Sequence, residues 1–578
     1  MNTVATDMWT KSLARRCGLA LVALTVSASS NGRAQTPSRG PANYRQTIAA
    51  LRDSIPAIMS REKVVGASIA LVEGGRVVWS QGFGHTDESQ QQRVDPTTTF
   101  SIQSISKTYT TVAFMRLVAN GQLSLEQRLR SVVPEFIVRS RLGPAEQDRI
   151  TFRQLLSHRA GFPHEAPRGG NFDNCECTFD EHVHSVFGSW LKSGVGERYA
   201  YSNVGIDLAG YAMEKKLKKP FDALMQELLL QPLSMSHSTF THDVAVKSTS
   251  FARGQIDGHD APAYLLPIQA AGGMYSNVID MAKFVSFELA DGRVGGRQLV
   301  PSHLLGEMAT IQAPTDHQVN GYGLGLELRR RYGTTVYTHG GGGFGYQTEQ
   351  RWIPSRHIGV IVLTNYGGDN SVAVPIAELA LAAMLQEREG KLPKTEPVVL
   401  TDTPVERVDS TVLKHLAGSY RGYSSTRTLR VVGDELQVVS GDRSTPLEAH
   451  GPAEFTTSFE RYRFRLDNGG KPIAIDYLGP NGTDVFFPNG RSDELPGPNR
   501  PEWAAFAGTY VGHSNGQEFT SDIDIRNGYL YTTRAGGTRL REYEPGLFFM
   551  SEGESVLFNG DRMMLGNRPF VRQRKVAP

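Results

Sequence analysis

The stretch Phe100-Ser101-Ile102-Gln103-Ser104-Ile105-Ser106-Lys107-Thr108 decides how the rest of the chain is interpreted. After it, apolar residues recur at helical spacing up to the stop signal Asn120-Gly121, which predicts a helix that begins near Ser104. Residues three positions apart share a helix face, so Ser104 and Lys107 should project in the same direction. A serine at a helix N-terminus also lies where the helix dipole favours developing negative charge. The stretch therefore predicts a nucleophile beside a candidate activator, a pattern that on its own also arises by chance.

Length and composition are typical of a soluble protein with several domains. The 578 residues exceed one ordinary core and suggest about three or four domains. The formal net charge is only +2, so no basic field indicates binding to nucleic acid. Residues 1–34 combine basic residues, a short apolar run and small residues, as in a secretory signal cut after Ala34. We expect an exported protein, periplasmic or secreted, without stable membrane insertion, and an N-terminal membrane anchor is the alternative.

Residues 40–390 alternate strand-like and helix-like segments, which predicts an α+β domain with an antiparallel sheet flanked by helices. Two strand-like runs flank the turn Glu73–Arg76 and should form a hairpin. The other expected elements are a helix after Asn203, helices at 221–230 and 372–389, and three neighbouring strands at 322–328, 335–339 and 357–363.

Beyond a proline-containing linker at 391–404, the sequence changes to short strands and turns and contains an internal repeat. The segment Leu416–Gly422 returns as Phe506–Gly512, and later aromatic residues match at a similar offset. We therefore expect two small antiparallel β-domains of the barrel type, at 405–495 and 502–578.

Two cysteines, Cys175 and Cys177, remain after the expected cleavage. They lie in a polar loop with several histidines nearby in the sequence, so a metal site is conceivable. Thiols one residue apart do not match a zinc-binding spacing, and a local disulfide or two free thiols is the favoured interpretation. Neither a metal nor another cofactor is expected.

Two further motifs supply what acyl transfer through a serine requires. Tyr201-Ser202-Asn203 stands before a predicted helix, and His339-Gly340-Gly341-Gly342-Gly343 ends a predicted strand. Such a reaction needs a nucleophile, a base and donors for the oxyanion. Ser104 supplies the hydroxyl, and Lys107 could lower the pKa of the Tyr201 phenol or act as the base itself.

The remaining groups would bind substrate. Asn203 can hydrogen-bond a substrate amide or hold the lysine, and the N–H groups of Gly342 and Ser104 would form an oxyanion hole. Each motif alone has an ordinary structural explanation, and His85 and His158 are interpreted as structural hydrogen-bonding residues. The order and context of the motifs together favour catalysis.

The string Phe100–Thr108 resembles the Ser-x-x-Lys box of penicillin-recognising serine hydrolases, the group around class C β-lactamases, DD-peptidases, D-aminopeptidases and related esterases. The resemblance extends over residues ~45–385, with three catalytic boxes in family order. It implies a β-lactamase/transpeptidase-like fold and a covalent acyl-enzyme. The catalytic residues implied are Ser104, Lys107 and Tyr201, and those implied in substrate or oxyanion binding are Asn203, His339, Gly341, Gly342 and the N–H of Ser104.

One departure from the family pattern bears on the substrate. Where β-lactamases and carboxypeptidases usually carry Lys-Thr-Gly, this chain has His339-Gly340-Gly341, as in D-aminopeptidases and several esterase-like members. Together with the two appended β-domains, this favours amides or short peptides that contain D-residues, by D-aminopeptidase-type or peptidoglycan-related cleavage. Carboxylesterase and then β-lactamase activity are the alternatives, and a cell-wall binding or sensor protein is the non-enzymatic one.

Two features of the family cannot be located in this sequence. No glutamate is assignable as a separate deacylation base, so Lys107 and Tyr201 are expected to serve both half-reactions. No loop of the last domain can be identified that reaches the pocket, as one does in D-aminopeptidases. The oligomeric state is also left open.

Overall fold

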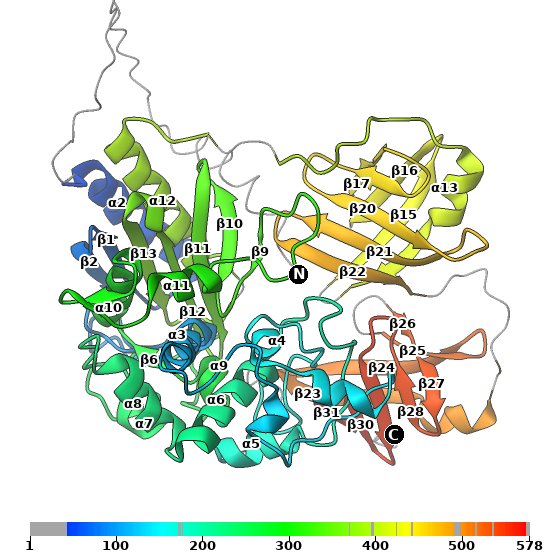
Figure 1. The fold of residues 1–578 in the computed structure, drawn as a ribbon, viewed down its shortest axis with the longest axis horizontal. Helices are drawn as coiled ribbons and strands as arrows, with labels where there is room; N and C mark the ends of the chain where they lie inside the picture. The colour runs from blue at the N-terminus through cyan, green and yellow to red at the C-terminus, as the bar shows by residue number, and fades with distance from the viewer. Residues whose placement is uncertain are drawn as a thin grey trace, which may run out of the picture.

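The computed structural model describes residues 43–573, apart from 172–174, 176, 369, 395–397, 423–424, 441–442, 490–497, 499, 515–516 and 534–536. The expected signal, residues 1–34, lies outside the described residues. One large unit of helices and strands is followed by two units of β-strands (Figure 1). Within the described ranges, no helix combines the length and the apolar character that crossing a membrane requires.

The large unit is built on a seven-stranded antiparallel sheet with the order β2-β1-β13-β12-β11-β10-β9. The first and last parts of this unit therefore pair in the middle of one sheet, where β1 lies beside β13. The strands are β1 Gly66–Glu73, β2 Arg76–Gly84, β9 Gly321–Tyr322, β10 Glu327–Arg331, β11 Thr334–Gly343, β12 Tyr346–Ile353 and β13 Ile358–Thr364.

A hydrophobic core lies on each face of this sheet. Successive side chains of β13 point to opposite faces of the sheet, so Val360 and Val362 belong to one core and Ile361 and Leu363 to the other. The helices α2 (Arg45–Glu62) and α12 (Ala373–Glu389) pack together over the first face (Figure 1). The second face is covered by α10 (Val278–Leu289), behind which lie the helices that carry the motifs.

The remaining helices of the large unit are mostly short. They are α3 Ser106–Ala119, α4 Phe152–Leu156, α5 Phe179–Ser185, α6 Asn203–Leu217, α7 Phe221–Met225, α8 His242–Val246, α9 Gln269–Gly272 and α11 Ser302–Met308. The helix expected over 221–230 is divided, because α7 ends at Met225 and a π-helical turn follows at Gln226–Leu230. The hairpin expected after residue 66 is confirmed as β1 and β2.

The α+β fold class is confirmed, but the prediction of three neighbouring strands is wrong in two respects. The segment 322–328 belongs to two strands, β9 and β10, which are paired with one another and separated by a turn. In addition, β12 lies between β11 and β13. Its middle residues Gln347–Gln350 are polar yet buried, so the strand lacks the alternation of apolar and polar residues on which the prediction relied.

The two C-terminal units are nearly closed antiparallel sheets of nine strands, barrel-like as expected. Their strand orders, β17-β16-β15-β14-β22-β21-β20-β19-β18 and β26-β25-β24-β23-β31-β30-β29-β28-β27, correspond strand by strand, which confirms the repeat. Even a local contact recurs, because the Tyr420 hydroxyl donates to the Leu416 carbonyl (2.6 Å) and that of Tyr510 donates to the Phe506 carbonyl (3.0 Å).

The strands of the first repeat are β14 Gly418–Arg421, β15 Thr426–Val432, β16 Glu435–Ser440, β17 Arg443–Pro446, β18 Glu448–Ala449, β19 Glu454–Thr456, β20 Arg461–Leu466, β21 Pro472–Gly479 and β22 Gly482–Pro488. Those of the second are β23 Gly508–Ser514, β24 Gln517–Arg526, β25 Tyr529–Thr532, β26 Thr538–Arg539, β27 Arg541–Glu544, β28 Leu547–Phe549, β29 Ser555–Asn559, β30 Arg562–Leu565 and β31 Arg568–Arg572. The helix α13 (Ser410–Leu416) precedes the first repeat.

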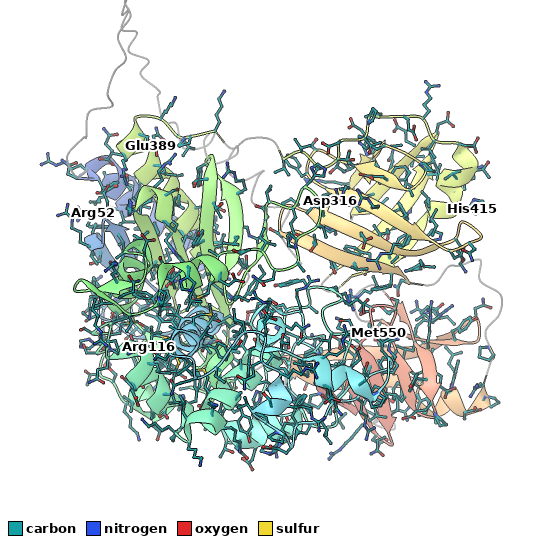
Figure 2. All side chains as sticks on the ribbon, in the orientation of Figure 1. Arg52, Arg116, Asp316, Glu389, His415 and Met550 are labelled. Carbon is teal, nitrogen blue, oxygen red and sulfur yellow. A yellow bond between two sulfur atoms is a disulfide. The ribbon has the colours of Figure 1, made fainter. Side chains whose placement is uncertain are left out.

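Both repeats dock on the large unit. Asp316, on the loop before β9, lies beside the first repeat (Figure 2), where Arg461 donates to its carbonyl at 3.1 Å. The second repeat is held by the buried ion pair between Lys192 Nζ and Glu554 Oε1 (3.0 Å). Glu552 accepts through its backbone oxygen from Arg198, so the loop after β28 is bound at two points.

Candidate active site

Ser104 lies in a 3-10 turn, Gln103–Ile105, that leads directly into α3. The preceding residue, Gln103, has φ = 51°, a left-handed conformation that is unfavourable for a side chain of this kind and recurs at functional sites. Ser104 is partly exposed at the start of the helix, whereas Lys107 is fully buried one turn later. Lys107 Nζ lies 3.0 Å from Ser104 Oγ, so the structure brings the expected nucleophile and activator into hydrogen-bond contact.

Burial tunes the Lys107 amine for proton transfer. Desolvation lowers its pKa to about 7, against smaller opposing effects of the Asp207 and Glu165 carboxylates. Lys107 Nζ also donates to the Ala271 carbonyl (2.7 Å), and the Ala271 N–H donates to Asp207 (3.0 Å). At neutral pH the free amine and the ammonium are therefore both populated, so Lys107 can accept a proton and release it again.

Tyr201 completes this group from the loop before α6. Its side chain hydrogen-bonds with Ser104, and Lys107 Nζ lies 4.9 Å from the centre of its ring. Burial raises the pKa of the Tyr201 phenol well above its ordinary value. The phenol therefore stays protonated at neutral pH, and of the two roles open to Lys107 the geometry favours that of the base.

The loop that carries Tyr201 is fixed by hydrogen bonds to the segment after α4. Ser202 caps α6, its hydroxyl accepting from the Gly205 N–H (3.3 Å) and donating to the Pro163 carbonyl (2.6 Å). The Asn203 N–H donates to the His164 carbonyl (2.8 Å), and His158 Nδ1 accepts from the Ser202 N–H (3.1 Å). His158 thus has the structural role expected from the sequence.

Glu165 is the site residue that the sequence did not reveal. It is 1% exposed, and its Oε1 accepts from Asn203 Nδ2 and Asn171 Nδ2, both at 2.7 Å. Burial raises the pKa of the Glu165 carboxyl, opposed by the Asn203 hydrogen bond and by the Lys107 and Arg568 charges. A glutamate was considered from the sequence only as a deacylation base, and Glu165 was not among the expected site residues. A single acid after Gly161-Phe162-Pro163 has no local pattern that distinguishes it from a surface residue.

His339 lies in the middle of β11, since the strand continues through the glycines to Gly343, and its side chain is buried and neutral. Its Nδ1 lies 2.7 Å from the Gly340 carbonyl and its Nε2 lies 3.0 Å from the Tyr322 hydroxyl. A carbonyl only accepts, so the ring proton is on Nδ1 and Nε2 accepts from Tyr322. Desolvation lowers the pKa of His339 to about 4. Both ring nitrogens are thus used within the protein, and neither offers a charge or a free N–H to a substrate carboxylate.

The glycines after His339 bring β11 against the turn of Ser104. A Cβ at Gly341 would lie 2.2 Å from the Ile102 carbonyl oxygen and 2.3 Å from Thr348 Oγ1, so a side chain cannot be accommodated there. Nothing lies within 4 Å of the corresponding position at Gly342, which is exposed. The close approach at Gly341 is what places the Gly342 backbone beside the turn that holds the Ser104 N–H.

The second repeat reaches the site through the turn between β30 and β31. Asn567 Nδ2 donates to the Glu165 carbonyl (2.9 Å), and the Arg568 charge lowers the pKa of both Glu165 and His164. This turn is the segment of the last unit that could not be identified in the sequence. On the other side, the first repeat places Gly482 against Gly321, next to Tyr322.

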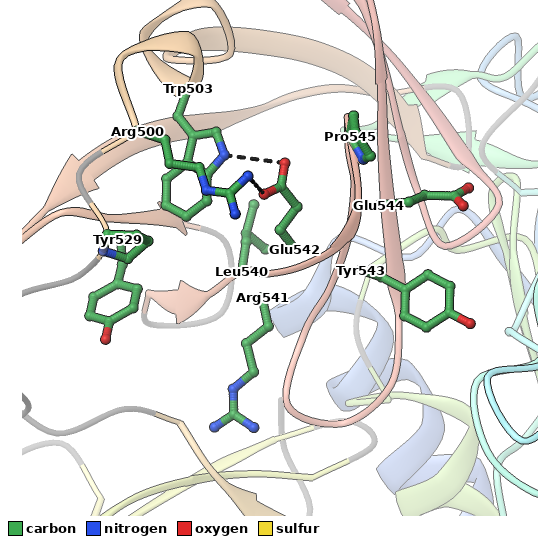
Figure 3. A pocket seen from close by; sticks show the side chains of 10 residues that line it. Arg500, Trp503, Tyr529, Leu540, Arg541, Glu542, Tyr543, Glu544 and Pro545 are labelled. Atoms are coloured by element: carbon green, nitrogen blue, oxygen red, sulfur yellow. Dashed lines mark hydrogen bonds and ion pairs between the residues drawn. The ribbon is translucent and has the colours of Figure 1, made fainter.

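A cavity of about 420 Å³ lies in the second repeat (Figure 3). Its wall includes Trp503 and Glu542, which hydrogen-bond to one another at 3.4 Å, and none of its lining residues belongs to the large unit.

Within the described ranges no cluster of histidine, cysteine and acidic residues could hold a metal ion. Cys175 and Cys177 form a disulfide, which is one of the two interpretations favoured above.

A model of the Beta-lactamase family matches residues 46–385. Protein flp of Staphylococcus aureus (strain NCTC 8325 / PS 47) is 27% identical over 208 residues, 36% of this chain and 39% of flp. A beta-lactamase of Providencia stuartii is 25% identical over 246 residues, 42% of this chain and 60% of that protein. The chain thus aligns with about two fifths of flp and three fifths of the beta-lactamase.

The fold also has a solved counterpart. The octameric penicillin-binding protein homologue from Pyrococcus abyssi superimposes with a TM-score of 0.50 at 24% identity, over 76% of this chain and 99% of that one. This likeness concerns the fold. Because the family model spans more than half of the chain and includes all three motifs, the protein belongs to the Beta-lactamase family of serine hydrolases.

Proposed function

We propose that the protein hydrolyses amides or short peptides that contain D-residues, through an acyl-enzyme on Ser104. The observation that carries this proposal is the contact of Ser104 Oγ with a buried lysine amine whose pKa is about 7. Asn203 and His339 then bear on the choice of substrate.

The proposed steps use only groups of this chain and water. Ser104 Oγ attacks the substrate carbonyl carbon while its proton passes to Lys107 Nζ, and the oxyanion is held by the N–H groups of Ser104 and Gly342. The C–N bond breaks, and the amine leaves with a proton from Lys107, relayed by the protonated Tyr201. Water then attacks the acyl-enzyme, gives a proton to Lys107, and releases the acid as the Ser104 hydroxyl is restored.

The charges of the site favour substrates that have no carboxylate near His339, the residue that stands where related enzymes have the lysine of Lys-Thr-Gly. His339 is neutral and both its nitrogens are engaged. Glu165 would repel an anion bound beside Asn203. This favours neutral or cationic substrates over penicillins and peptides with a free C-terminal carboxylate.

A substrate that carries an N–H near Asn203 is favoured over a simple acyl ester. Asn203 Nδ2 donates to Glu165, which leaves Oδ1 buried and without a partner among the described residues. That oxygen can accept a hydrogen bond from an N–H of the substrate, which a simple acyl ester lacks. The preference for D-residues rests on the resemblance of the His-Gly-Gly box to D-aminopeptidases.

Labelling by a fluorophosphonate probe tests the reaction class. We expect stoichiometric labelling that is lost in Ser104→Ala, and an unlabelled but folded wild-type protein would instead support a binding or sensor role. D-aminoacyl p-nitroanilides, their L-enantiomers, p-nitrophenyl esters and nitrocefin then test the substrate. Turnover of nitrocefin or of simple esters with no detectable cleavage of any D-anilide would contradict the proposal.

A further inference from the structure

Glu165 and its neighbours present a group of acceptor atoms that the proposed chemistry does not use. Glu165 Oε2, Asn203 Oδ1 and Asn171 Oδ1 are all inaccessible to solvent and have no hydrogen-bond partner among the described residues. Their other polar atoms meet at Glu165 Oε1, which also lies 3.3 Å from His164 Nδ1. Buried polar atoms are rarely left without a partner in folded proteins, so these three indicate a missing ligand.

The chemistry of the cluster fixes what that ligand must offer. An ionised carboxylate only accepts hydrogen bonds, so both asparagines must turn their NH₂ groups toward Glu165 and leave their carbonyl oxygens free. Three unused acceptors beside one negative charge match a primary ammonium, which has three N–H donors and no acceptor. A carboxylate or phosphate ligand would find neither a donor nor a positive charge in these three atoms.

The cluster lies within reach of the reacting groups. Asn203 belongs to the motif that places Tyr201 against Ser104, and the Glu165 charge acts on the pKa of both Lys107 and Tyr201. The carboxylate is held in place from its backbone side, because Asn567 of the second repeat donates to the Glu165 carbonyl. In the binding mode proposed below, a substrate whose carbonyl carbon lies at Ser104 extends its acyl side toward this cluster.

We propose that Glu165, with Asn203 and Asn171, binds the free α-ammonium group of the substrate's acyl residue, which makes the enzyme an aminopeptidase rather than an endopeptidase or an acylamidase. This inference rests on the proposed function and specifies its substrate. Glu165 is then the specificity-determining residue, because blocking the substrate amine would remove the charge it binds.

Two substrates that differ at the amine alone provide the test. We expect wild-type kcat/KM for D-alanine p-nitroanilide to exceed that for N-acetyl-D-alanine p-nitroanilide. In Glu165→Gln, kcat/KM for the free-amine substrate should fall about tenfold or more, as expected for removal of one charge-assisted hydrogen bond. The kcat/KM for the acetylated substrate should change little. Any effect of the lost charge on Lys107 acts on both substrates and cancels in their ratio.

Two further variants guard against a merely structural effect. A Cβ at Gly170 would lie 2.8 Å from Glu165 Oε2, so Gly170→Ala should lower the same ratio while the carboxylate is retained. Glu288→Gln is the matched control, since Glu288 is a buried glutamate on α10 whose pKa is raised to about 8 and which is therefore already neutral at pH 7. Its ratio should equal that of the wild type.

The outcomes separate this inference from the proposed function. Equal wild-type rates for the two anilides, or an unchanged ratio in Glu165→Gln, would overturn the role of Glu165 although amide hydrolysis stands. If neither anilide is cleaved, the amide proposal fails, and the thiobenzyl esters of D-alanine and N-acetyl-D-alanine are compared instead. A preference for the free-amine ester that is lost in Glu165→Gln would still support the role of Glu165. Loss of both anilide activities in Glu165→Gln, with unchanged fluorophosphonate labelling, would also count against a role in specificity.

Discussion

Gly341→Ala, compared with Gly342→Ala, tests how β11 is positioned against the nucleophile. The two substitutions add the same methyl group to adjacent residues of one strand. At Gly341 the new Cβ would lie 2.2 Å from the Ile102 carbonyl oxygen, whereas at Gly342 nothing lies within 4 Å. The contact at Gly341 is with backbone, so it cannot be relieved by a side-chain rotation.

The size of the effect follows from these distances. Real Cβ atoms essentially never approach another heavy atom within 3.0 Å, so β11 and the Ser104 turn must separate by about 0.8 Å. A displacement of about 1 Å between catalytic groups reduces rates by roughly 10²-fold, so Gly341→Ala should slow acylation by about that factor. Overpacking of this kind costs about 1–3 kcal/mol of stability, which leaves the fold intact.

The assay is the second-order rate of fluorophosphonate labelling, with thermal unfolding as the measure of integrity. Gly342→Ala keeps its N–H and should label within about threefold of the wild type. Labelling of Gly341→Ala at the wild-type rate would refute the argument. So would an equal loss in both variants, because the structure predicts no clash at Gly342.

Three other predictions follow from the buried charges. Because the base must be the free amine of Lys107, kcat/KM should rise with pH about a midpoint near 7. Asp207→Asn removes a carboxylate that raises the Lys107 pKa, so it should move this midpoint to lower pH. A shift of the midpoint to higher pH would contradict the assignment of Lys107 as the base. Lys107→Ala should lose at least a factor of about 10² in kcat/KM, and near-full turnover in that variant would exclude Lys107 as the base. Lys192→Met removes the ion-pair partner of the buried Glu554, so denaturant unfolding should show a loss of about 3–5 kcal/mol of stability. The double variant Lys192→Met with Glu554→Leu should restore this stability, and equal stability of the single and double variants would show that the pair is not coupled.

Local patterns were sufficient for the parts of this protein whose residues are close in sequence. Ser104 and Lys107 are one helical turn apart, and the helices α3 and α12 have apolar residues at helical spacing, so each could be recognised from a short window. The repeat was visible because Leu416–Gly422 returns as Phe506–Gly512 with later aromatic residues at a similar offset, and the matching strand orders confirm it. The roles expected for the site residues stay predictions until the variants are measured.

What the sequence could not show depends on distant partners. Glu165 becomes a site residue only because Asn203 and Asn567, 38 and 402 positions away, are folded against it. The neutral state of His339 likewise depends on burial and on Tyr322, whereas a histidine replacing a lysine could equally have been a cation. Neither burial nor a tautomer can be deduced from residue order.

The 402-residue span between Glu165 and Asn567 has a consequence for how the enzyme is made. Ser104, Lys107 and Tyr201 are translated long before the turn that supports Glu165. A growing chain, or one that is truncated before β30, therefore lacks a support of its substrate-binding wall. Under the proposal above, selectivity for a free amine, rather than hydrolysis itself, depends on the second repeat being present and folded.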